Sequence, residues 1–128
     1  MTIQVLIVDD SPVMRSFIKR VLNMSGLEIA AILEAGHGGQ ALEVLRGNPV
    51  DLILSDINMP VMNGEEFLRA AKADKALWAI PFIVVSTDAR LDRVDQMMDL
   101  GASGYITKPF QPENLRAEVE RILAVSHG

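Results

Sequence analysis

Residues 51–64 read DLILSDINMPVMNG, and this stretch decides the fold class. The segment of residues 50–54 is short and mostly apolar, which is typical of a buried β-strand. The strand ends just before Asp56, and Pro60 then marks a loop that leads into a helix predicted over residues 65–73. Asp56 is therefore predicted to stand at the carboxyl end of a buried strand.

The same unit of a short strand followed by a helix recurs on both sides of this stretch. Glycine and proline residues separate the units, as is usual for turns. The predicted strands cover residues 3–8, 27–33, 50–54, 82–85 and 105–106, and the predicted helices cover residues 12–26, 39–46, 65–73, 91–100 and 112 onward. This alternation predicts a doubly wound, flavodoxin-like α/β fold, in which a five-stranded parallel sheet carries helices on both faces.

Three of the predicted helices carry apolar residues at helical spacing. They are Val13, Phe17 and Val21 in the first helix, Ala41, Leu42 and Leu45 in the second, and Leu115, Val119 and Ile122 in the last. We expect these stripes to mark the sides of the helices that pack on the sheet.

Length and composition limit the classes of function. The chain has 128 residues, a net charge of −5 and no cysteine, and we expect a single domain over residues 1–128. The acidic balance argues against binding nucleic acid or anionic membranes through overall charge. A short apolar run at the N-terminus is too brief for a signal peptide or a membrane span. Together with the lack of cysteine, this favours a cytoplasmic protein whose partners are proteins or small ligands.

Polar residues gather at the carboxyl ends of the predicted strands. They are Asp9, Asp10, Asp56, Ser86, Thr87 and Lys108. Parallel strands bring these ends to one edge of the sheet, where ligands bind at the point at which the strand order reverses. Singly, each residue has an ordinary explanation, such as helix capping or a solvated surface position. Their joint placement is what favours a functional site.

The three aspartates predict a site for Mg2+. Carboxylates this close repel one another, so a cation is needed to stabilise them, and Mg2+ prefers oxygen ligands. We expect Asp10 and Asp56 to be direct ligands and Asp9 to act mainly through a coordinated water. The loop at Asn58 is expected to add a main-chain carbonyl.

A carboxylate next to a bound metal can serve as a nucleophile toward phosphorus and form an acyl phosphate. Asp56 is the predicted nucleophile. The ammonium group of Lys108 can then pair with the phosphoryl oxygens, and the hydroxyl of Ser86 can donate a hydrogen bond to one of them.

At these positions the chain resembles the receiver domain of two-component response regulators, especially the single-domain CheY-like chemotaxis type. The resemblance covers nearly the whole chain and rests on four segments: VLIVDDSPVMR (5–15), DLILSDINMPVMNG (51–64), FIVVSTDA (82–89) and GASGYITKPF (101–110). It implies that Asp56 accepts a phosphoryl group from a phosphohistidine of a histidine kinase or a histidine phosphotransfer protein. It also implies that Asp9 and Asp10 bind Mg2+ and that Lys108 contacts the phosphoryl group.

The resemblance further implies a conformational switch. Ser86 senses the phosphoryl group, and Tyr105 matches an aromatic residue that turns inward when the hydroxyl residue moves. The peptide bond between Lys108 and Pro109 is expected to be cis. Output then changes on the face formed by the fourth helix, the fifth strand and the fifth helix, where a downstream protein binds, a flagellar motor switch being one such target. The chain would act as a monomeric signalling switch, not as a metabolic enzyme.

Two positions depart from the usual family pattern. Ser86 stands where threonine is commoner, so coupling to Tyr105 is expected to be looser. Thr87 stands where alanine or glycine is common, and it is expected to narrow access to the acyl phosphate. We also predict that Asn58 and Asp88 tune dephosphorylation by orienting or excluding the attacking water.

Two other functions have a foothold in the sequence. Residues 36–41, GHGGQA, fit the pattern G-x-G-x-x-A of dinucleotide-binding loops, with Asp56 twenty residues beyond Gly36. In that fold, however, the glycine turn follows the first strand, which here ends in two acids. A phosphatase of the haloacid dehalogenase type also uses a strand-end aspartate, but it needs a second carboxylate two residues downstream, where this chain has Asn58.

Overall fold

The structure is a computed structural model that describes the main chain of residues 2–127 and the side chains of residues 2–124. Strands and helices alternate along the described chain, as predicted. The elements are β1 (Ile3–Val8), α1 (Pro12–Met24), β2 (Ile29–Ala35), α2 (Gly38–Gly47), β3 (Leu52–Ser55), α3 (Gly64–Ala73), β4 (Phe82–Ser86), α4 (Leu91–Asp99), β5 (Gly104–Thr107) and α5 (Pro112–His127).

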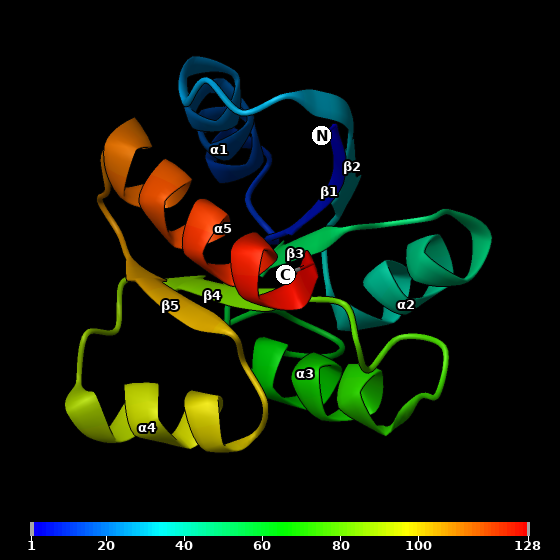
Figure 1. The fold of residues 1–128 in the computed structure, drawn as a ribbon. Coiled ribbons are helices and arrows are strands. Elements are labelled where there is room, and N and C mark those ends of the chain that lie inside the picture. Colours follow the sequence, from blue (N-terminus) through cyan, green and yellow to red (C-terminus); the bar gives the residue numbers. More distant parts are fainter. Residues whose placement is uncertain (1, 128) are drawn as a thin grey trace.

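The five strands form one parallel sheet in the order β2-β1-β3-β4-β5. Figure 1 shows α1 and α5 on one face of the sheet and α2, α3 and α4 on the other. This confirms the predicted doubly wound, flavodoxin-like α/β fold. The chain leaves β1 toward β2 on one side and returns to β3 on the other, so the strand order reverses between β1 and β3.

Alternation along the central strands divides the core into two layers. Val5 and Ile7 of β1 pack with the helices α1 and α5. Leu6 and Val8 point the other way and pack with α2, α3 and α4. Successive side chains of a strand point to opposite faces, so one short apolar strand serves both layers.

The predicted stripes of two helices are buried as expected. Ala41, Leu42 and Leu45 of α2 and Leu115, Val119 and Ile122 of α5 are at most 8% exposed. In α1 two of the three predicted residues face the core, because Val21 is buried and Phe17 packs against the same layer, whereas Val13 is 80% exposed. Ile18 and Leu22 complete the buried side of the helix. Val13 lies in the first turn of α1.

The second strand begins later than predicted. Residue 27 was expected to open it, but Gly26 has a positive φ of 87° and the Leu27 amide donates to the Ser25 hydroxyl at 3.3 Å. The strand instead runs to Ala35, whose carbonyl accepts a hydrogen bond from the Asp9 amide at 3.1 Å. The apolar run ends before Glu34, but pairing with β1 extends the strand to Ala35.

Within the described part of the chain, no helix is both long and apolar enough to cross a membrane.

Candidate functional site

The reversal of strand order places two aspartates side by side. Val8 of β1 pairs with Ser55 of β3, so the residues that follow them, Asp9 and Asp56, leave the sheet as neighbours. The Asp56 amide donates to the Val8 carbonyl at 2.9 Å, which extends the ladder by one residue. With Asp10, these residues form a cluster in which one oxygen of each carboxylate lies within 4.8 Å of the others.

Asp9 is the most firmly held of the three acids. It is 2% exposed, and its Oδ1 accepts the Ser11 amide at 2.9 Å. Its Oδ2 lies 3.1 Å from the Lys108 ammonium, and its carbonyl accepts a hydrogen bond from Arg15 at 2.6 Å. Asp10 is exposed. The cluster therefore combines a fixed inner acid with an outer one that faces solvent.

Lys108 reaches the cluster from the end of β5. Its side chain is 9% exposed and its Nζ lies 3.6 Å from Asp56 Oδ2. The Lys108 amide donates to the Ser86 carbonyl at 2.8 Å, and the peptide bond to Pro109 is cis, as the family resemblance implies. Lys108 and the aspartates are thus brought together from three strands that are far apart in sequence.

The Asp56 carboxylate has a raised pKa, so a further positive charge beside it would stabilise its ionised form. Burial is the main reason that its pKa is raised, and the neighbouring Asp9 acts in the same direction. The Lys108 ammonium and the Ile57 amide, 2.7 Å from Oδ1, lower the pKa but do not cancel the effect of burial. Every side chain of the acidic cluster offers oxygen, the donor that Mg2+ prefers. The cluster therefore fits a hard divalent cation.

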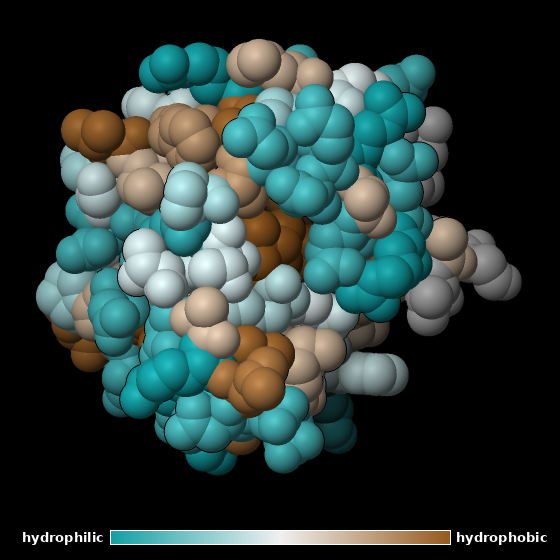
Figure 2. All heavy atoms as spheres, turned by 90° about the vertical axis from the view of Figure 1, so that its left-hand side faces the viewer, coloured by the Kyte–Doolittle hydropathy of each residue, from teal (hydrophilic) through white to brown (hydrophobic). Residues whose placement is uncertain are grey.

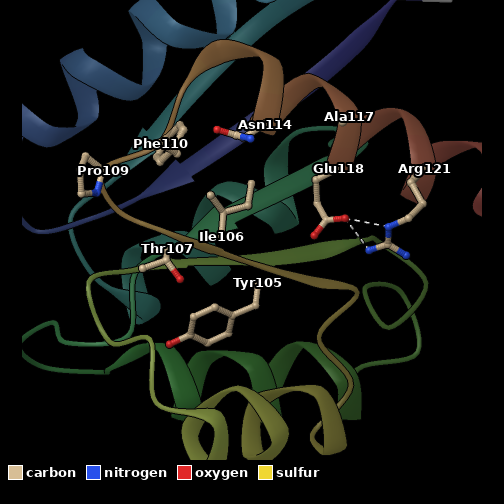
Figure 3. Close-up of a pocket in the computed structure, with 9 residues that line it drawn as sticks. All are labelled: Tyr105, Ile106, Thr107, Pro109, Phe110, Asn114, Ala117, Glu118 and Arg121. Atoms are coloured by element: carbon tan, nitrogen blue, oxygen red, sulfur yellow. Dashed lines mark hydrogen bonds and ion pairs between the residues drawn. The ribbon is translucent and has the colours of Figure 1, made fainter.

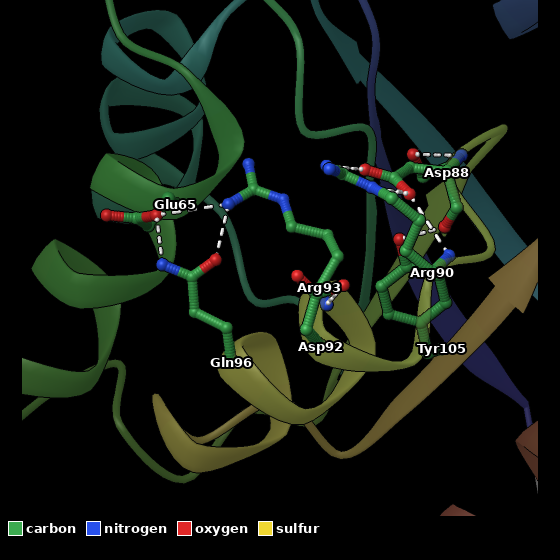
Figure 4. Close-up of polar contacts among 8 residues, drawn as sticks. Glu65, Asp88, Arg90, Asp92, Arg93, Gln96 and Tyr105 are labelled. Atoms are coloured by element: carbon green, nitrogen blue, oxygen red, sulfur yellow. Dashed lines mark hydrogen bonds and ion pairs between the residues drawn. The ribbon is translucent and has the colours of Figure 1, made fainter.

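Ser86 and Tyr105 are connected through Asp88. Ser86 is 1% exposed, and its hydroxyl accepts the Asp88 amide at 3.1 Å. The Tyr105 hydroxyl donates to the Asp88 carbonyl, as Figure 4 shows. Burial raises the pKa of Tyr105 above its ordinary value of 10.0, while a hydrogen bond with the Ser86 side chain acts in the opposite direction. One residue thus links the hydroxyl predicted to sense phosphate with the aromatic residue predicted to switch.

The three predicted tuning residues lie on loops around the cluster. Asn58 and Thr87 are exposed. The Asp88 carboxylate binds Arg90, with oxygen to nitrogen distances of 2.7 and 2.9 Å. Hydrogen bonds from Arg90 hold the pKa of Asp88 at about 2. Asp88 is therefore ionised and already paired with Arg90.

Sequence reasoning missed two supports of the site. A Cβ on Gly64 would lie 2.1 Å from the Asp56 carbonyl oxygen, so only glycine lets α3 begin this close to the acidic residue. Arg15 joins the Asp9 carbonyl to Glu34 of β2, 3.0 Å from its Nε. The Asn-Gly pair signals a turn in sequence, but nothing in the sequence shows what lies against it.

The glycine-rich loop that resembles a dinucleotide-binding turn has other contacts. The Gly36 amide donates to the side chain of Gln40 at 2.6 Å, and the Gly38 amide donates to the Met62 carbonyl at 2.9 Å. His37 caps α2 by accepting the Gln40 amide at its Nδ1. Two of the amides that would bind a pyrophosphate are therefore used within the protein.

A hollow of about 410 Å3 lies between β5 and α5. Its walls include the apolar residues Ile106 and Phe110 and the ion pair between Glu118 and Arg121 (Figure 3). Figure 2 looks onto the side of the molecule that carries α4 and β5 and shows apolar atoms in a depression that is bordered by hydrophilic atoms on the right. This surface is large enough to receive side chains of a partner.

A parallel sheet with three acids and a lysine at its switch point defines a class of α/β domain whose acidic cluster can hold a divalent cation. The family model of the response regulator receiver domain matches residues 5–120. The chain belongs to the response regulator receiver domain family.

Similar proteins carry chemotaxis names. The chain is 36% identical over 125 residues to the chemotaxis protein CheY of Pseudomonas aeruginosa, covering 98% of this chain and 99% of that protein. It is 36% identical over 124 residues to the chemotaxis protein CheY1 of Helicobacter pylori, covering 96% and 98%. Among solved structures, the chemotaxis response regulator CheY4 of Vibrio cholerae is 32% identical, with a TM-score of 0.82 over 95% of this chain and 99% of that chain. A putative response regulator from Chloroflexus aurantiacus is 25% identical, with a TM-score of 0.87 over 97% and 99%.

Proposed function

We propose that this receiver domain is a phosphorylation-controlled switch in chemotaxis or a related two-component pathway. Its phosphodonor would be a phosphohistidine of a sensor kinase or of a histidine phosphotransfer protein. The observation that carries the proposal is the meeting of Asp9, Asp10, Asp56 and Lys108 at the switch point of the sheet. The chemotaxis assignment is supported by the names of the relatives.

In the proposed reaction an oxygen of Asp56 attacks phosphorus. The new O–P bond forms as the P–N bond to the donor histidine breaks, and the imidazole leaves with the bonding electrons and takes up a proton. Lys108 offsets charge on the phosphoryl oxygens, and Ser86 donates a hydrogen bond to one of them.

A Mg2+ ion would be held directly by Asp10 and Asp56, through water by Asp9, and by the main-chain carbonyl of Asn58. Bound there, it would neutralise charge between the nucleophile and the phosphoryl group. Asn58, two residues after Asp56, cannot transfer a proton, so we propose slow autodephosphorylation in place of multiple turnovers. Asn58, Thr87 and Asp88 would tune that rate.

The output would pass from Ser86 through Asp88 to Tyr105 and then to the surface of α4, β5 and α5. The hollow beside β5 is the proposed contact for a downstream protein, of which a flagellar motor switch is one example. We propose a cytoplasmic protein that acts as a monomer and signals through protein contacts, without binding nucleic acid or membrane.

Phosphotransfer profiling against the histidine kinases of the host tests this function. Label should move to the wild-type chain in the presence of Mg2+, should stop when EDTA is added, and should be absent from Asp56→Asn. Label retained on Asp56→Asn would overturn the acceptor assignment. Repeated hydrolysis of a generic phosphomonoester would instead support a phosphatase, and saturable NADH binding would support a dinucleotide site.

A further inference from the structure

Arg90 makes a two-point contact with Asp88 in the loop between β4 and α4. Arg90 Nε lies 2.9 Å from Asp88 Oδ1, and Arg90 Nη2 lies 2.7 Å from Oδ2 (Figure 4). The Arg90 amide also donates to Oδ1 at 3.1 Å. The side chain and main chain of one residue therefore close a tight turn around the Asp88 carboxylate.

The main chain of Asp88 has two further partners. Its amide donates to the Ser86 hydroxyl, and its carbonyl receives the Tyr105 hydroxyl. Thr87 and Ala89, on either side, are exposed. Asp88 is thus the residue through which this loop is anchored to both groups, and the position of its carbonyl decides whether Tyr105 has this acceptor in addition to the Ser86 hydroxyl.

The start of α4 gives the loop little support. Arg90 occupies the N-cap position without a side-chain hydrogen bond to the helix, and Leu91, the first helical residue, is 80% exposed. An N-cap side chain normally satisfies one of the free amides of the first turn. Here the side chain of the cap residue turns back to Asp88, so the ion pair adds to the main-chain hydrogen bonds that hold the loop.

We propose that Arg90 is a positioning residue: by binding the Asp88 carboxylate at two points, it holds the Asp88 carbonyl where the Tyr105 hydroxyl can donate to it. Arg90 then sets the fraction of molecules in which Tyr105 is bound. The effect on signalling rests on the proposed function, but the effect on Tyr105 does not.

The exposure of the pair limits the size of the effect. The side chains of Arg90 and Asp88 are 70% and 21% exposed. Exposed ion pairs are weak, and losing one is expected to change the ratio of bound to free Tyr105 by about twofold to fivefold. Arg90 would therefore shift the fraction of molecules in which Tyr105 is hydrogen-bonded to Asp88, without holding every molecule in that state.

The chain offers a direct reporter and a matched control. Tyr105 is the only tyrosine, so 3-fluorotyrosine gives one assignable 19F resonance. Arg93 lies on the same helix but contacts Glu65 and Gln96 instead of Asp88 (Figure 4). Arg93→Ala therefore removes a charge that also acts on Asp88 and Tyr105, but it removes no hydrogen bond to the Asp88 carboxylate.

The experiment compares 19F spectra of the unphosphorylated wild type, Arg90→Ala, Asp88→Asn, Arg90→Lys and Arg93→Ala, with the urea-unfolded chain as the free-tyrosine reference. We expect Arg90→Ala and Asp88→Asn to move the resonance toward the reference and to speed hydrogen exchange of the Asp88 amide by about twofold to fivefold. Arg90→Lys should restore part of the shift, and Arg93→Ala, which removes charge but no contact with Asp88, should move the resonance less than Arg90→Ala does and leave exchange of the Asp88 amide unchanged. Circular dichroism checks that each variant is folded.

An unchanged resonance in folded Arg90→Ala and Asp88→Asn would overturn the proposal. An equal shift in Arg93→Ala would also overturn it, because the cause would then be general loosening of α4. Since no phosphodonor is present, a chain that never accepts phosphate on Asp56 would still show the Tyr105 shift. Failure of the proposed function and failure of this inference are therefore separate results.

Discussion

Asp56 is stabilised in its neutral form by the fold that builds the site. Burial raises its pKa above the ordinary value of 3.8, so the folded chain binds this proton more tightly than the unfolded chain does. The resulting contribution to stability is complete below pH 3.8 and is lost as the pH rises through the folded pKa. At neutral pH the charged carboxylate therefore opposes folding, while Lys108 offsets part of this effect.

Removing this charge should stabilise the metal-free protein. We expect Asp56→Asn to have a higher urea midpoint than the wild type at pH 7 in EDTA, with the difference shrinking as the pH is lowered toward 3.8. Adding Mg2+ should raise the wild-type midpoint by mass action and should have little effect on the variant. A lower midpoint for Asp56→Asn in EDTA would show that the carboxylate is not destabilising.

Val61 is held in an unfavourable conformation at a loop tip. Its φ is 64°, and the Met62 amide donates to the Pro60 carbonyl at 2.7 Å across it. A β-branched side chain is strained in this region, whereas asparagine tolerates it. Val61 is also 84% exposed, so little packing is lost when it is replaced.

Relief of this strain should be measurable. We expect Val61→Asn to increase the free energy of unfolding by about 1 kcal/mol. Val61→Thr is the matched control, because it also removes an apolar group but keeps the β-branch, and it should give no such gain. Equal stability of the two variants in urea titrations would contradict the role of backbone strain.

At the level of elements, α4 is held less firmly than its neighbour α3. The helix α3 begins with a capping box formed by Asn63 and Glu66 and buries four residues. The helix α4 has no side-chain cap and buries Met97 alone. Its polar contacts with α3 are made by Glu65, which accepts hydrogen bonds from Gln96 at 3.0 Å and from Arg93 at 3.4 Å. An element held this way can move without disturbing the core.

Hydrogen exchange should rank these two helices. We expect the amides of α4 to exchange at least about tenfold faster than those of α3, because local opening exposes less apolar surface. Asn63→Ala should narrow the gap by weakening the α3 cap, at a cost of about 1 kcal/mol. Equal protection in the wild type would show that contacts other than Met97 and the cap decide the stability of α4.

Across the whole molecule, a single sheet separates two hydrophobic layers. Phe67 belongs to the layer under α2, α3 and α4, and Leu115 belongs to the layer under α1 and α5. Both layers pack on the same central strands, so neither can lose its packing without exposing the sheet. The two layers should therefore unfold together.

Substitutions in either layer should weaken the same transition. We expect Phe67→Ala to cost about 3–5 kcal/mol and Leu115→Ala about 2–5 kcal/mol. Fluorescence of Trp78, the only tryptophan, and circular dichroism should give coincident unfolding curves in urea for each variant. Two separate transitions in either variant would contradict a shared core.

By itself, the sequence determined the element order, the two-sided parallel sheet and the polar residues at its carboxyl edge. Apolar runs, turn residues and helical periodicity are local, so Asp56 and Lys108 could be placed at strand ends without coordinates. Pairing is not local, which is why the apolar pattern predicts too early a start for the second strand and includes Val13 in an apolar stripe. Only the tertiary structure decided which groups touch: Asp88 binds Arg90 and receives Tyr105, and Gly64 lies against Asp56. Contacts of this kind depend on how distant segments pack, and the pattern along the chain does not record that packing.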